Sequence, residues 1–533
     1  MKTVRSSTHL LIWLVWGIVV SIEPANVVAA DESAAVDLLL KGGTIIDGSG
    51  SPGVVGDVAI RGDKIVGVGN VHFSHVDKTI DCSGLIVVPG FIDLHTHSDE
   101  QVVSKTMRGC VNYLLQGCTT SVTGNCGSGP VDVADYYRKI DEAGAGNNIA
   151  HLIPQGYVRL AVVGNIDRRA TDEEKLRMCE LARKGMSDGA WGMSSGLIYV
   201  PSVYADTAEL VELAKVIGTH GGIYASHIRG EGHNLLTAIN EALTIGKDAK
   251  CAVHVSHIKA SGAENWGHIR QAAAMIETAR AAGQIVTADQ YPYIASSTSL
   301  EPTLFPSWAR SGGSKGLLEK LNDPETAARI KADVQKSLDS ANDGDNVVIS
   351  RFRPKQAWVG KSVKQIAISE GKTPFEIACE IARGGDAGVV NFSMSEDDVR
   401  FAMKLPWVAT ASDGRSYLPG ADRPHPRSYG TFARKIGYYA IKEKLLTLEQ
   451  AVHTATGLPA DIIGFTDRGY LKPGLAADVV VFDPNQFIDT ATYENPHRYA
   501  SGVKFVLVNG TPAVHEGVPT GALAGKALRK PAK

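Results

Sequence analysis

The chain has few of the features that mark disulfide-stapled or nucleic-acid-binding proteins. Its 533 residues contain only seven cysteines, at scattered positions, so a disulfide framework is not expected. Lys and Arg (54) nearly balance Asp and Glu (57), and no long block of one sign is present. A polyanionic or polycationic partner is therefore not indicated. The expected partner is a small molecule, with no nucleic acid.

The chain also has few long apolar runs, and the most evident one lies at the N-terminus. Lys2 and Arg5 precede the run from Leu10 to Ile22. Val28-Ala29-Ala30 follows it. This order is typical of a secretory signal peptide, and the run is shorter than the ~20 residues that span a bilayer. We expect cleavage near Ala30 and export to the periplasm or the medium, with no integral membrane domain afterwards. A retained membrane anchor is the alternative.

Short β-like runs broken by glycine occupy both ends of the remaining chain. They extend from Val36 to Val88 with an alternation suited to a half-buried antiparallel sheet. The same texture returns from Gly469 to Pro484 and from Val503 to Gly517. We therefore predict one small β-sandwich domain formed by both chain ends, residues 31–88 and 466–533.

Between these ends, short apolar strands alternate with helical stretches, which is typical of βα units and a parallel sheet. The predicted strands are Phe91–His97, Thr119–Thr123, Ala150–Pro154, Gly189–Ser194, Gly222–His227, Cys251–His257, Ile285–Gln290 and Trp407–Asp413. Polar residues at the strand ends favour a closed (β/α)8 TIM-like barrel over residues 89–465, because such barrels build their sites at the C-terminal face. A doubly wound open sheet is the alternative, and Val389–Met394 is a further candidate strand.

The stretch from about residue 300 to 400 is too long for one crossover between barrel strands. It reads as helices at Glu325–Ser340 and Pro374–Gly384 with a short strand at Asn346–Arg351. We predict an insertion before the last barrel strand. Capping the site and a purely structural role both fit a segment of this length.

His95 and His97 end the first predicted barrel strand. Residues two apart on a strand point to one face, which lets neighbouring imidazoles share a metal. An isolated His-x-His pair more often joins two unrelated polar residues. Here GFIDLHTHSD follows a Pro-Gly turn and ends an apolar strand, so the context favours a metal site.

Four other predicted strands end in the same manner. Cys126 follows one strand in a glycine-rich turn, and Asp413 ends the last strand. His227 and His257 end their strands in matching Ser-His-Ile contexts. If the strands are parallel, these groups converge, and such a donor set suits zinc better than magnesium or calcium. A buried thiol and backbone-bonded core histidines are the alternatives.

Taken together, these segments carry a family resemblance. GFIDLHTH, the NCG turn, SHIRGE, SHIK, DQYPYIASST, ASDG and HPRSYGTFAR resemble the N-acyl-D-amino acid deacylases, or D-aminoacylases, of the amidohydrolase superfamily. The resemblance covers nearly all of the mature chain. It implies zinc-dependent hydrolysis of the amide bond of N-acyl-D-amino acids, giving a carboxylate and a free D-amino acid.

The resemblance also implies a set of metal ligands. One tightly bound Zn²⁺ is implied on Cys126, His227 and His257, where most of the superfamily uses a carboxylated lysine instead of a cysteine. A second, weaker position is framed by three further residues, His95, His97 and Asp413. Asp413 is implied as the catalytic acid and base.

An N-acyl amino acid presents a free carboxylate, and cations lie beside the predicted ligands. Lys259 and Arg229 each follow a predicted ligand histidine by two residues, where an ordinary rim charge is the alternative. The resemblance favours Lys259, with Tyr291 and Arg427, as a carboxylate clamp, since arginine can bind a carboxylate bidentately. Arg229 is kept as a supporting candidate for substrate binding.

Three further residues are candidates for the substrate site. Ser297 in IASST is a candidate hydroxyl for the clamp, although small loop residues usually serve turn geometry. Tyr199 and Tyr204 are candidates to line the side-chain pocket, with plain packing as the alternative. The sequence does not show which D-amino acid the pocket prefers.

Two other functions compete with deacylation. One is another amidohydrolase reaction, such as cyclic imide or ureide hydrolysis or dipeptide cleavage, because a fold does not fix a function. The carboxylate clamp favours an open-chain substrate. The other is a non-catalytic exported binding protein with structural zinc. The full set of six candidate ligands argues against it, since a structural site needs only four.

Overall fold

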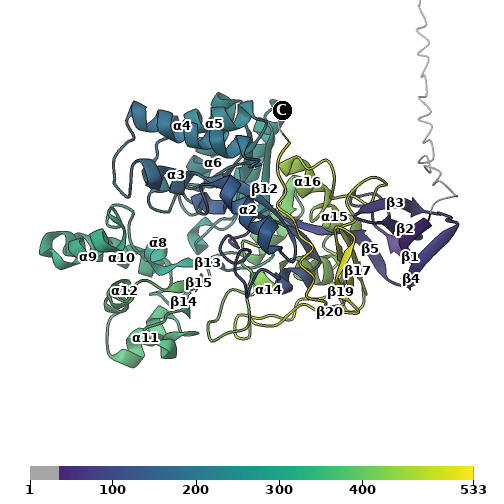
Figure 1. Ribbon diagram of the computed structural model, residues 1–533. Coiled ribbons are helices and arrows are strands. Elements are labelled where there is room, and N and C mark those ends of the chain that lie inside the picture. The colour runs from purple at the N-terminus through teal and green to yellow at the C-terminus, as the bar shows by residue number, and fades with distance from the viewer. Residues whose placement is uncertain (1–34, 532–533) are drawn as a thin grey trace, which may run out of the picture.

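The computed structural model describes residues 35–531. The predicted signal peptide lies outside the described residues. None of the helices in residues 35–531 combines the length and the apolar composition that a membrane span requires. The chain forms a barrel, a sheet built from both chain ends, and an inserted segment on the other side of the barrel in this view (Figure 1).

Eight parallel strands form the barrel, in the order β16-β12-β11-β10-β9-β8-β7-β6. They are β6 (Phe91–Asp93), β7 (Cys118–Thr123), β8 (Asn148–Pro154), β9 (Gly192–Gly196), β10 (Ile223–His227), β11 (Ala252–Val255), β12 (Val286–Gln290) and β16 (Val408–Thr410). The two ends of the row meet beyond the strands, where Asp413 N donates to His95 O and His97 N donates to Gly414 O. The (β/α)8 prediction is therefore confirmed, and the open-sheet alternative is wrong.

Helices lie between and around the barrel strands (Figure 1). Several begin with the local signals that favour a helix start: α4, for example, has a capping box of Thr171 and Glu174 and an acidic first turn. The helices are α1 (Val111–Leu114), α2 (Val133–Ala143), α3 (Gln155–Val162), α4 (Asp172–Ser187), α5 (Thr207–Thr219), α6 (Leu235–Ala249), α7 (His268–Ala281), α13 (Glu396–Met403), α14 (Arg427–Ala433), α15 (Leu448–His453) and α16 (Gly457–Ile463). A π-helical stretch, Arg434–Lys442, directly continues α14.

Both chain ends contribute to one nine-stranded sheet, as the returning β pattern predicts. Its strands are β1 (Ala35–Ile45), β2 (Val54–Arg61), β3 (Lys64–Gly69), β4 (His75–Asp81), β5 (Ile86–Pro89), β17 (Val479–Phe482), β18 (Val503–Val508), β19 (Thr511–His515) and β20 (Val518–Pro519). The sheet is mixed rather than purely antiparallel, because β1 pairs in parallel with β4 along its first part and with β5 along its end. A register shift between Leu40 and Gly43, in the pairing of β1 with β2, lies near the change of partner.

The insertion before β16 has its own sheet and its own hydrophobic cluster. Its elements are β13 (Ser296–Ser299), α8 (Leu300–Leu304), α9 (Gly313–Asn322), α10 (Pro324–Ser340), β14 (Val347–Arg351), α11 (Val363–Glu370), α12 (Pro374–Arg383) and β15 (Gly388–Asn391). The candidate strand at Val389–Met394 corresponds to β15, which pairs with β13 and β14 and not with a barrel strand. The insertion therefore packs as a separate unit whose sheet begins directly after β12.

Candidate metal centre

The predicted ligands converge at the C-terminal ends of the barrel strands. His95 follows β6, Cys126 lies in a 3-10 turn after β7, and His227 is the last residue of β10. His257 and Asp413 follow β11 and β16. Cys126, His257 and Asp413 have positive φ angles of 51°, 34° and 48°. Such backbone is costly for residues other than glycine and clusters at functional sites.

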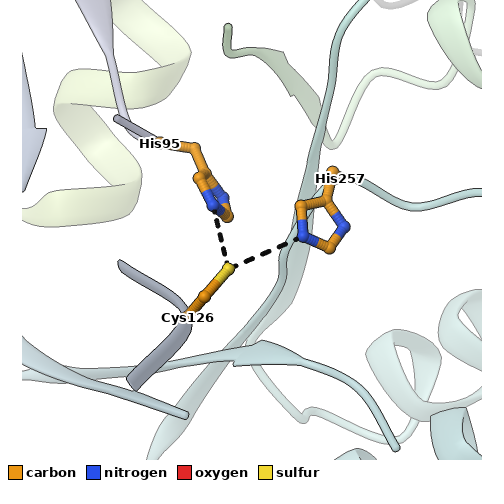
Figure 2. Close-up of side chains that lie close together, drawn as sticks. All are labelled: His95, Cys126 and His257. Carbon is orange, nitrogen blue, oxygen red and sulfur yellow. Dashed lines mark hydrogen bonds between the residues drawn. The ribbon is translucent and has the colours of Figure 1, made fainter. Parts of the chain in front are cut away.

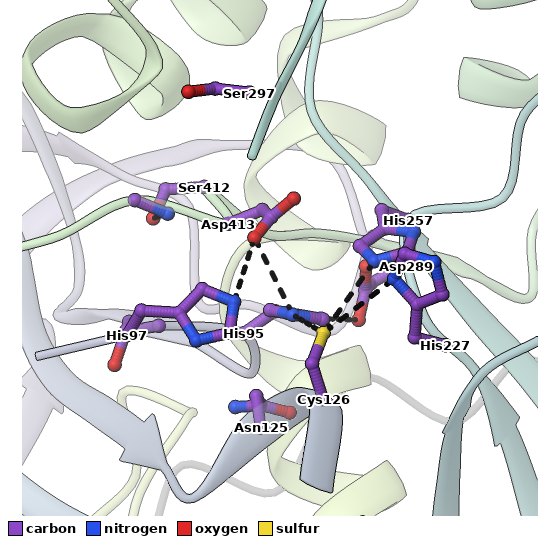
Figure 3. Close-up of polar contacts among 12 residues, drawn as sticks. His95, His97, Asn125, Cys126, His227, His257, Asp289, Ser297, Ser412 and Asp413 are labelled. Atoms are coloured by element: carbon purple, nitrogen blue, oxygen red, sulfur yellow. Dashed lines mark hydrogen bonds and ion pairs between the residues drawn. The ribbon is translucent and has the colours of Figure 1, made fainter. Parts of the chain in front are cut away.

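The Cys126 thiol is surrounded by three imidazoles (Figure 3), and Figure 2 shows two of them, those of His95 and His257. Its Sγ lies 3.3 Å from His95 Nε2, 3.7 Å from His227 Nδ1 and 3.8 Å from His257 Nε2. All four residues are buried. The ligand atoms of His95, Cys126 and His257 lie within 4.8 Å of one another, which is compact enough to bind one ion.

A second group adjoins the first and shares His95 with it. Asp413 Oδ1 lies 3.1 Å from His97 Nε2 and 3.6 Å from His95 Nε2 (Figure 3). These three residues also form a candidate metal-binding group. His95 therefore borders both positions, although the resemblance assigns it to the second one alone.

Two carboxylates that sequence reasoning left without a role, the partly buried Glu231 and the buried Asp289, contact the candidate ligands. Glu231 Oε1 lies 2.9 Å from His257 Nδ1, and His227, Glu231 and His257 form a third candidate group. Asp289, at the end of β12, accepts from the His257 backbone N–H at 2.5 Å and lies 3.4 Å from His95 Nδ1. A carboxylate on the second nitrogen of a ligating histidine fixes its tautomer and orientation. Glu231 lies in the SHIRGE motif and Asp289 in DQYPYIASST. The rule that a ligating histidine bonds a carboxylate could have identified both residues from the sequence.

The neighbouring charges favour the thiolate form of Cys126 and the carboxylate form of Asp413. Burial alone would raise the pKa of the Cys126 thiol, but His95, His227 and His257 outweigh it and lower that pKa well below its usual value. Burial would also raise the pKa of Asp413, yet Arg427 and His95 lower it well below its usual value. A thiolate at Cys126 and a carboxylate at Asp413 are therefore the favoured forms beside these imidazoles.

The donor set fits zinc. Thiolate sulfur, imidazole nitrogen and carboxylate oxygen are the ligands that zinc takes in proteins. Within the described structure, the buried His227 Nε2 has no hydrogen-bond partner, and its Nδ1 faces the Cys126 sulfur. Placing these groups together in a buried site is costly unless a cation or other partner satisfies them.

The predicted carboxylate clamp lies beside the metal centre. Lys259 Nζ is 2.5 Å from Glu231 Oε1 and 5.7 Å from the Tyr291 ring centroid. The Arg427 guanidinium lies 4.7 Å from the same centroid, and its Nη1 is 2.8 Å from Asp413 Oδ2. Lys259 and Arg427 are both buried, so neither is an ordinary rim charge.

The other substrate candidates divide into two groups. Ser297 donates to Val389 O, and Tyr199 lies with its ring 5.1 Å from His227 and its hydroxyl 3.0 Å from Thr298 Oγ1. Both residues line cavities beside the metal centre. Arg229 instead bonds Glu241 and the carbonyls of Val203 and Ala205. Arg229 and Tyr204 line neither of these cavities in the described structure, and Tyr204 donates to Ser307 O.

Two cavities open onto the centre. The first, of about 330 Å³, is lined by His97, Cys126 and Arg427, and we name it the His97-side cavity. The second, of about 780 Å³, is lined by Lys259 and Tyr291, and we name it the Lys259-side cavity. The residues that line both are Tyr199, His257, Ser297, Thr298 and Asp413. A molecule bound at the centre therefore has room on two sides.

Comparison with known proteins finds the same architecture over nearly the full chain. Residues 78–514 match the amidohydrolase family. A D-aminoacylase from Alcaligenes xylosoxydans xylosoxydans is 36% identical over 524 residues, covering 94% of this chain and 99% of that protein.

Two solved structures extend the comparison to metal sites. An N-acyl-D-glutamate deacylase from Bordetella bronchiseptica, complexed with zinc and a phosphonate mimic of the tetrahedral intermediate, has a TM-score of 0.79 and 33% identity. A D-aminoacylase with a binuclear metal centre, described as activated by one metal and attenuated by the second, has a TM-score of 0.80 and 33% identity. Each similarity covers 93% of this chain and 100% of the other.

Proposed function

The chain belongs to the amidohydrolase family and, within it, to the D-aminoacylases, and on that premise we propose that it hydrolyses the amide bond of N-acyl-D-amino acids at a zinc centre. The observation that carries the proposal is the buried Cys126 thiol among three histidines, with Asp413 facing both cavities. The products are a carboxylate and a free D-amino acid.

Cys126, His227 and His257 are the proposed ligands of the tightly bound zinc ion. His95, His97 and Asp413 frame the second, weaker position, and His95 adjoins both. When bound, zinc lowers the pKa of water toward ~7 and polarises a carbonyl oxygen. Glu231 accepts from His257 Nδ1 and so keeps His257 Nε2 directed at the metal position.

Asp413 is the proposed acid and base. Its pKa is low because Arg427 and His95 lie beside it, so it is ionised at neutral pH and can accept a proton from the attacking water. Its place on the border between the two cavities lets it return that proton to the amine nitrogen as the C–N bond breaks. One residue thereby serves both proton transfers.

Lys259, Tyr291 and Arg427 are the proposed carboxylate clamp, with Ser297 beside them. Lys259 and Arg427 supply positive charge, and Tyr291 lies near both cations. Clamping the carboxylate positions the amide against the metal centre, which lowers the entropic part of the barrier. A free carboxylate next to the amide distinguishes an N-acyl amino acid from a cyclic imide or ureide.

A direct test combines metal analysis with product release. Protein purified after zinc-replete expression is expected to contain at least one zinc ion per chain. It should release amine from a panel of N-acetyl-D-amino acids and release far less from the matching L-compounds. Activity on L-compounds alone would contradict the proposal, and so would a protein free of bound metal that remains fully active.

Export is a separate proposal that rests on the order of charge and apolar residues in positions 1–30. Cell fractionation and N-terminal sequencing of the recovered chain test it. We expect a periplasmic or secreted protein that starts close to Asp31. A full-length chain found in the cytoplasm would contradict export. A location that stays the same after deletion of residues 1–30 would also contradict it.

A further inference from the structure

Three of the candidate ligands have backbone conformations that residues other than glycine rarely adopt. Cys126, His257 and Asp413 are left-handed, with φ angles of 51°, 34° and 48°. In this region the Cβ atom of an L-residue crowds a backbone carbonyl, so the conformation persists only where the surroundings enforce it. Contacts that hold the backbone at these three residues are therefore needed to keep the ligand atoms together.

A buried carboxylate holds the backbone at two of these ligands. Asp289 Oδ1 accepts from the N–H of His257 itself at 2.5 Å. Asp99 Oδ1 accepts at 2.7 Å from the N–H of Gly124, where the turn that contains Cys126 begins. Both hydrogen bonds act on the main chain and do not use the side chain that would bind a metal.

Asp93 holds the backbone at the third ligand and also joins two barrel strands. Its buried Oδ1 accepts from the N–H of Ser412 at 3.0 Å, directly before Asp413, and from the N–H of His95 at 3.1 Å. One oxygen thereby connects the end of β16 to the end of β6, the two strands at the ends of the barrel row. The distance of 3.6 Å between the side chains of His95 and Asp413 depends on this connection.

The three carboxylates lie outside both the cavity walls and the candidate metal-binding groups of residues 35–531. Asp289 also contacts the side chains of His95 and His254. Within the described structure, Asp93 and Asp99 form no hydrogen bond or ion pair with the side chain of a candidate ligand. Variants of Asp93 and Asp99 therefore test the main-chain contacts without removing a contact to a ligand side chain.

We propose that Asp93, Asp99 and Asp289 are positioning residues that hold the left-handed ligands in their metal-binding arrangement before an ion binds. This inference rests on the zinc centre of the proposed function and deepens it. The main-chain hydrogen bonds preorganise the centre, so zinc binds without first having to impose the left-handed conformations. Without the carboxylate acceptor, the nearby backbone relaxes and the ligand atom moves away from its neighbours.

The first test measures the bond between Cys126 and a metal ion. Cobalt(II) is added to metal-stripped protein, where a bound thiolate gives a thiolate-to-cobalt charge-transfer absorption. Asp99→Ala should weaken this absorption, and zinc affinity, measured by competition with a chelating dye, should fall by about 10–100-fold. Asp99→Asn keeps an oxygen acceptor for the N–H of Gly124 and should stay within about threefold of wild type.

The second test addresses Asp93, which acts on the other side of the centre. Asp93→Ala should leave the cobalt absorption from Cys126 unchanged. It should lower kcat by about 10–100-fold, because Asp413 is displaced from the reacting atoms, while KM changes by less than about threefold. Asp93→Asn keeps an oxygen acceptor for both N–H groups and should retain kcat within about threefold.

The asparagine variants separate the hydrogen bond from the charge. The charge of Asp93 interacts with His95, and that of Asp99 with His97. Asparagine removes this charge but keeps the acceptor, so asparagine variants as impaired as the alanine variants would overturn the proposal. Alanine variants that behave like wild type would overturn it too. If an alanine variant does not fold, the asparagine variant still decides: metal binding and kcat near wild type support the hydrogen bond, and their loss overturns it.

Asp398→Ala is the matched control for both tests. Asp398 is buried, and its Oδ2 accepts at 2.8 Å from the N–H of Gly267, which has a φ of 89°. It lies outside the described cavity walls and metal-binding groups. The control should keep the cobalt absorption, the zinc affinity and kcat of wild type. Losses in the control equal to those of the alanine variants would overturn the specific role of the three carboxylates.

The wild-type protein separates this inference from the function on which it rests. Wild-type protein that shows the thiolate-to-cobalt absorption and releases D-amino acids retains the proposed function, whatever the variants do. Wild-type protein without that absorption refutes the proposed zinc centre itself, and the positioning roles with it.

Discussion

The barrel and the insertion contribute different residues to the candidate site. The barrel strands end in the candidate ligands, which form one buried cluster of thiol, imidazole and carboxylate. The insertion has a hydrophobic cluster of its own and, in the part of the chain that the structure describes, adds no residue to the candidate metal-binding groups. It lines the cavities instead, through residues such as Ser350, Arg351 and Phe392. The insertion thus contributes walls to the substrate cavities, whereas the candidate metal-binding groups lie on the barrel.

The largest expected effect comes from the barrel cluster. Cys126→Ser replaces a thiolate with a hydroxyl that stays protonated at neutral pH, so zinc content and turnover should both collapse, turnover by about 10³-fold or more, beyond the ~10–100-fold typical of outer ligand partners. Metal analysis and kcat measure the two losses. Cys118→Ser is the matched control, because Cys118 is buried on β7 outside the cluster and should keep its zinc. Equal zinc loss in both variants would point to misfolding.

Asp413→Asn should separate chemistry from metal binding. The amide cannot accept and return a proton, so kcat should fall by about 10²–10⁴-fold. Zinc at Cys126, His227 and His257 should remain in the purified variant. Asp422→Asn alters another carboxylate lining the same cavity and should leave kcat within about threefold. A near-normal kcat for Asp413→Asn would remove it from the proton-transfer role.

Glu231→Gln tests whether Glu231, which contacts the candidate ligand His257, affects zinc affinity and activity. Gln can still accept from His257 Nδ1 but lacks the charge that also engages Lys259. We expect zinc affinity or activity to fall by about 10–100-fold. The control is Glu264→Gln, since Glu264 lines the Lys259-side cavity outside the candidate metal groups. Identical behaviour of the two variants would assign Glu231 no role beyond cavity charge.

Ile377→Ala sharpens the contrast between the two parts. Ile377 is fully buried in the insertion cluster, and its truncation should cost about 2–5 kcal/mol of local stability. Limited proteolysis should then cut within residues 300–400 earlier than in wild type, while zinc content stays unchanged. Loss of zinc from this variant would show that the barrel site depends on the packing of the insertion.

The smallest expected effect is a pH dependence within the insertion. Burial, and next Asp386, raise the pKa of Glu301 from 4.5 to about 7. Its protonated form therefore stabilises the fold at low pH, and that contribution is lost as pH rises from about 4.5 to 7. Glu301→Gln should raise the melting temperature at pH 8 and change it little at pH 4. Glu319→Gln, at an exposed position on α9, should alter neither. A gain at pH 4 alone would reverse the assigned sign.

The barrel strands and the cluster of candidate ligands could be predicted from the sequence because both depend on local signals. Short apolar runs between glycine turns mark the strands, and parallel strands bring the residues at their carboxyl ends to one edge. Nothing local distinguishes Lys259 from Arg229, since each follows a predicted ligand histidine by two residues. Lys259 is buried beside Glu231, whereas Arg229 bonds Glu241 on α6. Their different positions depend on what each loop packs against.

Contacts between residues that lie far apart in the sequence could not be predicted from the sequence. Asp289 reaches His95 and the His257 backbone from a third strand, so its importance depends on strand order. The strand β15 has the same apolar texture as a barrel strand, but its partners are β13 and β14. The composition of a short apolar strand does not indicate which sheet the strand joins.

Arg427 affects both substrate recognition and proton transfer, because it belongs to the proposed carboxylate clamp and also forms an ion pair with Asp413. A substrate carboxylate that binds Arg427 competes with Asp413 for that guanidinium and weakens its hold on the carboxylate beside the scissile amide. The pKa of Asp413, now held low, then rises and makes it a stronger base. An amide without a carboxylate leaves the pair intact, so the enzyme should discriminate against it through kcat as well as through KM.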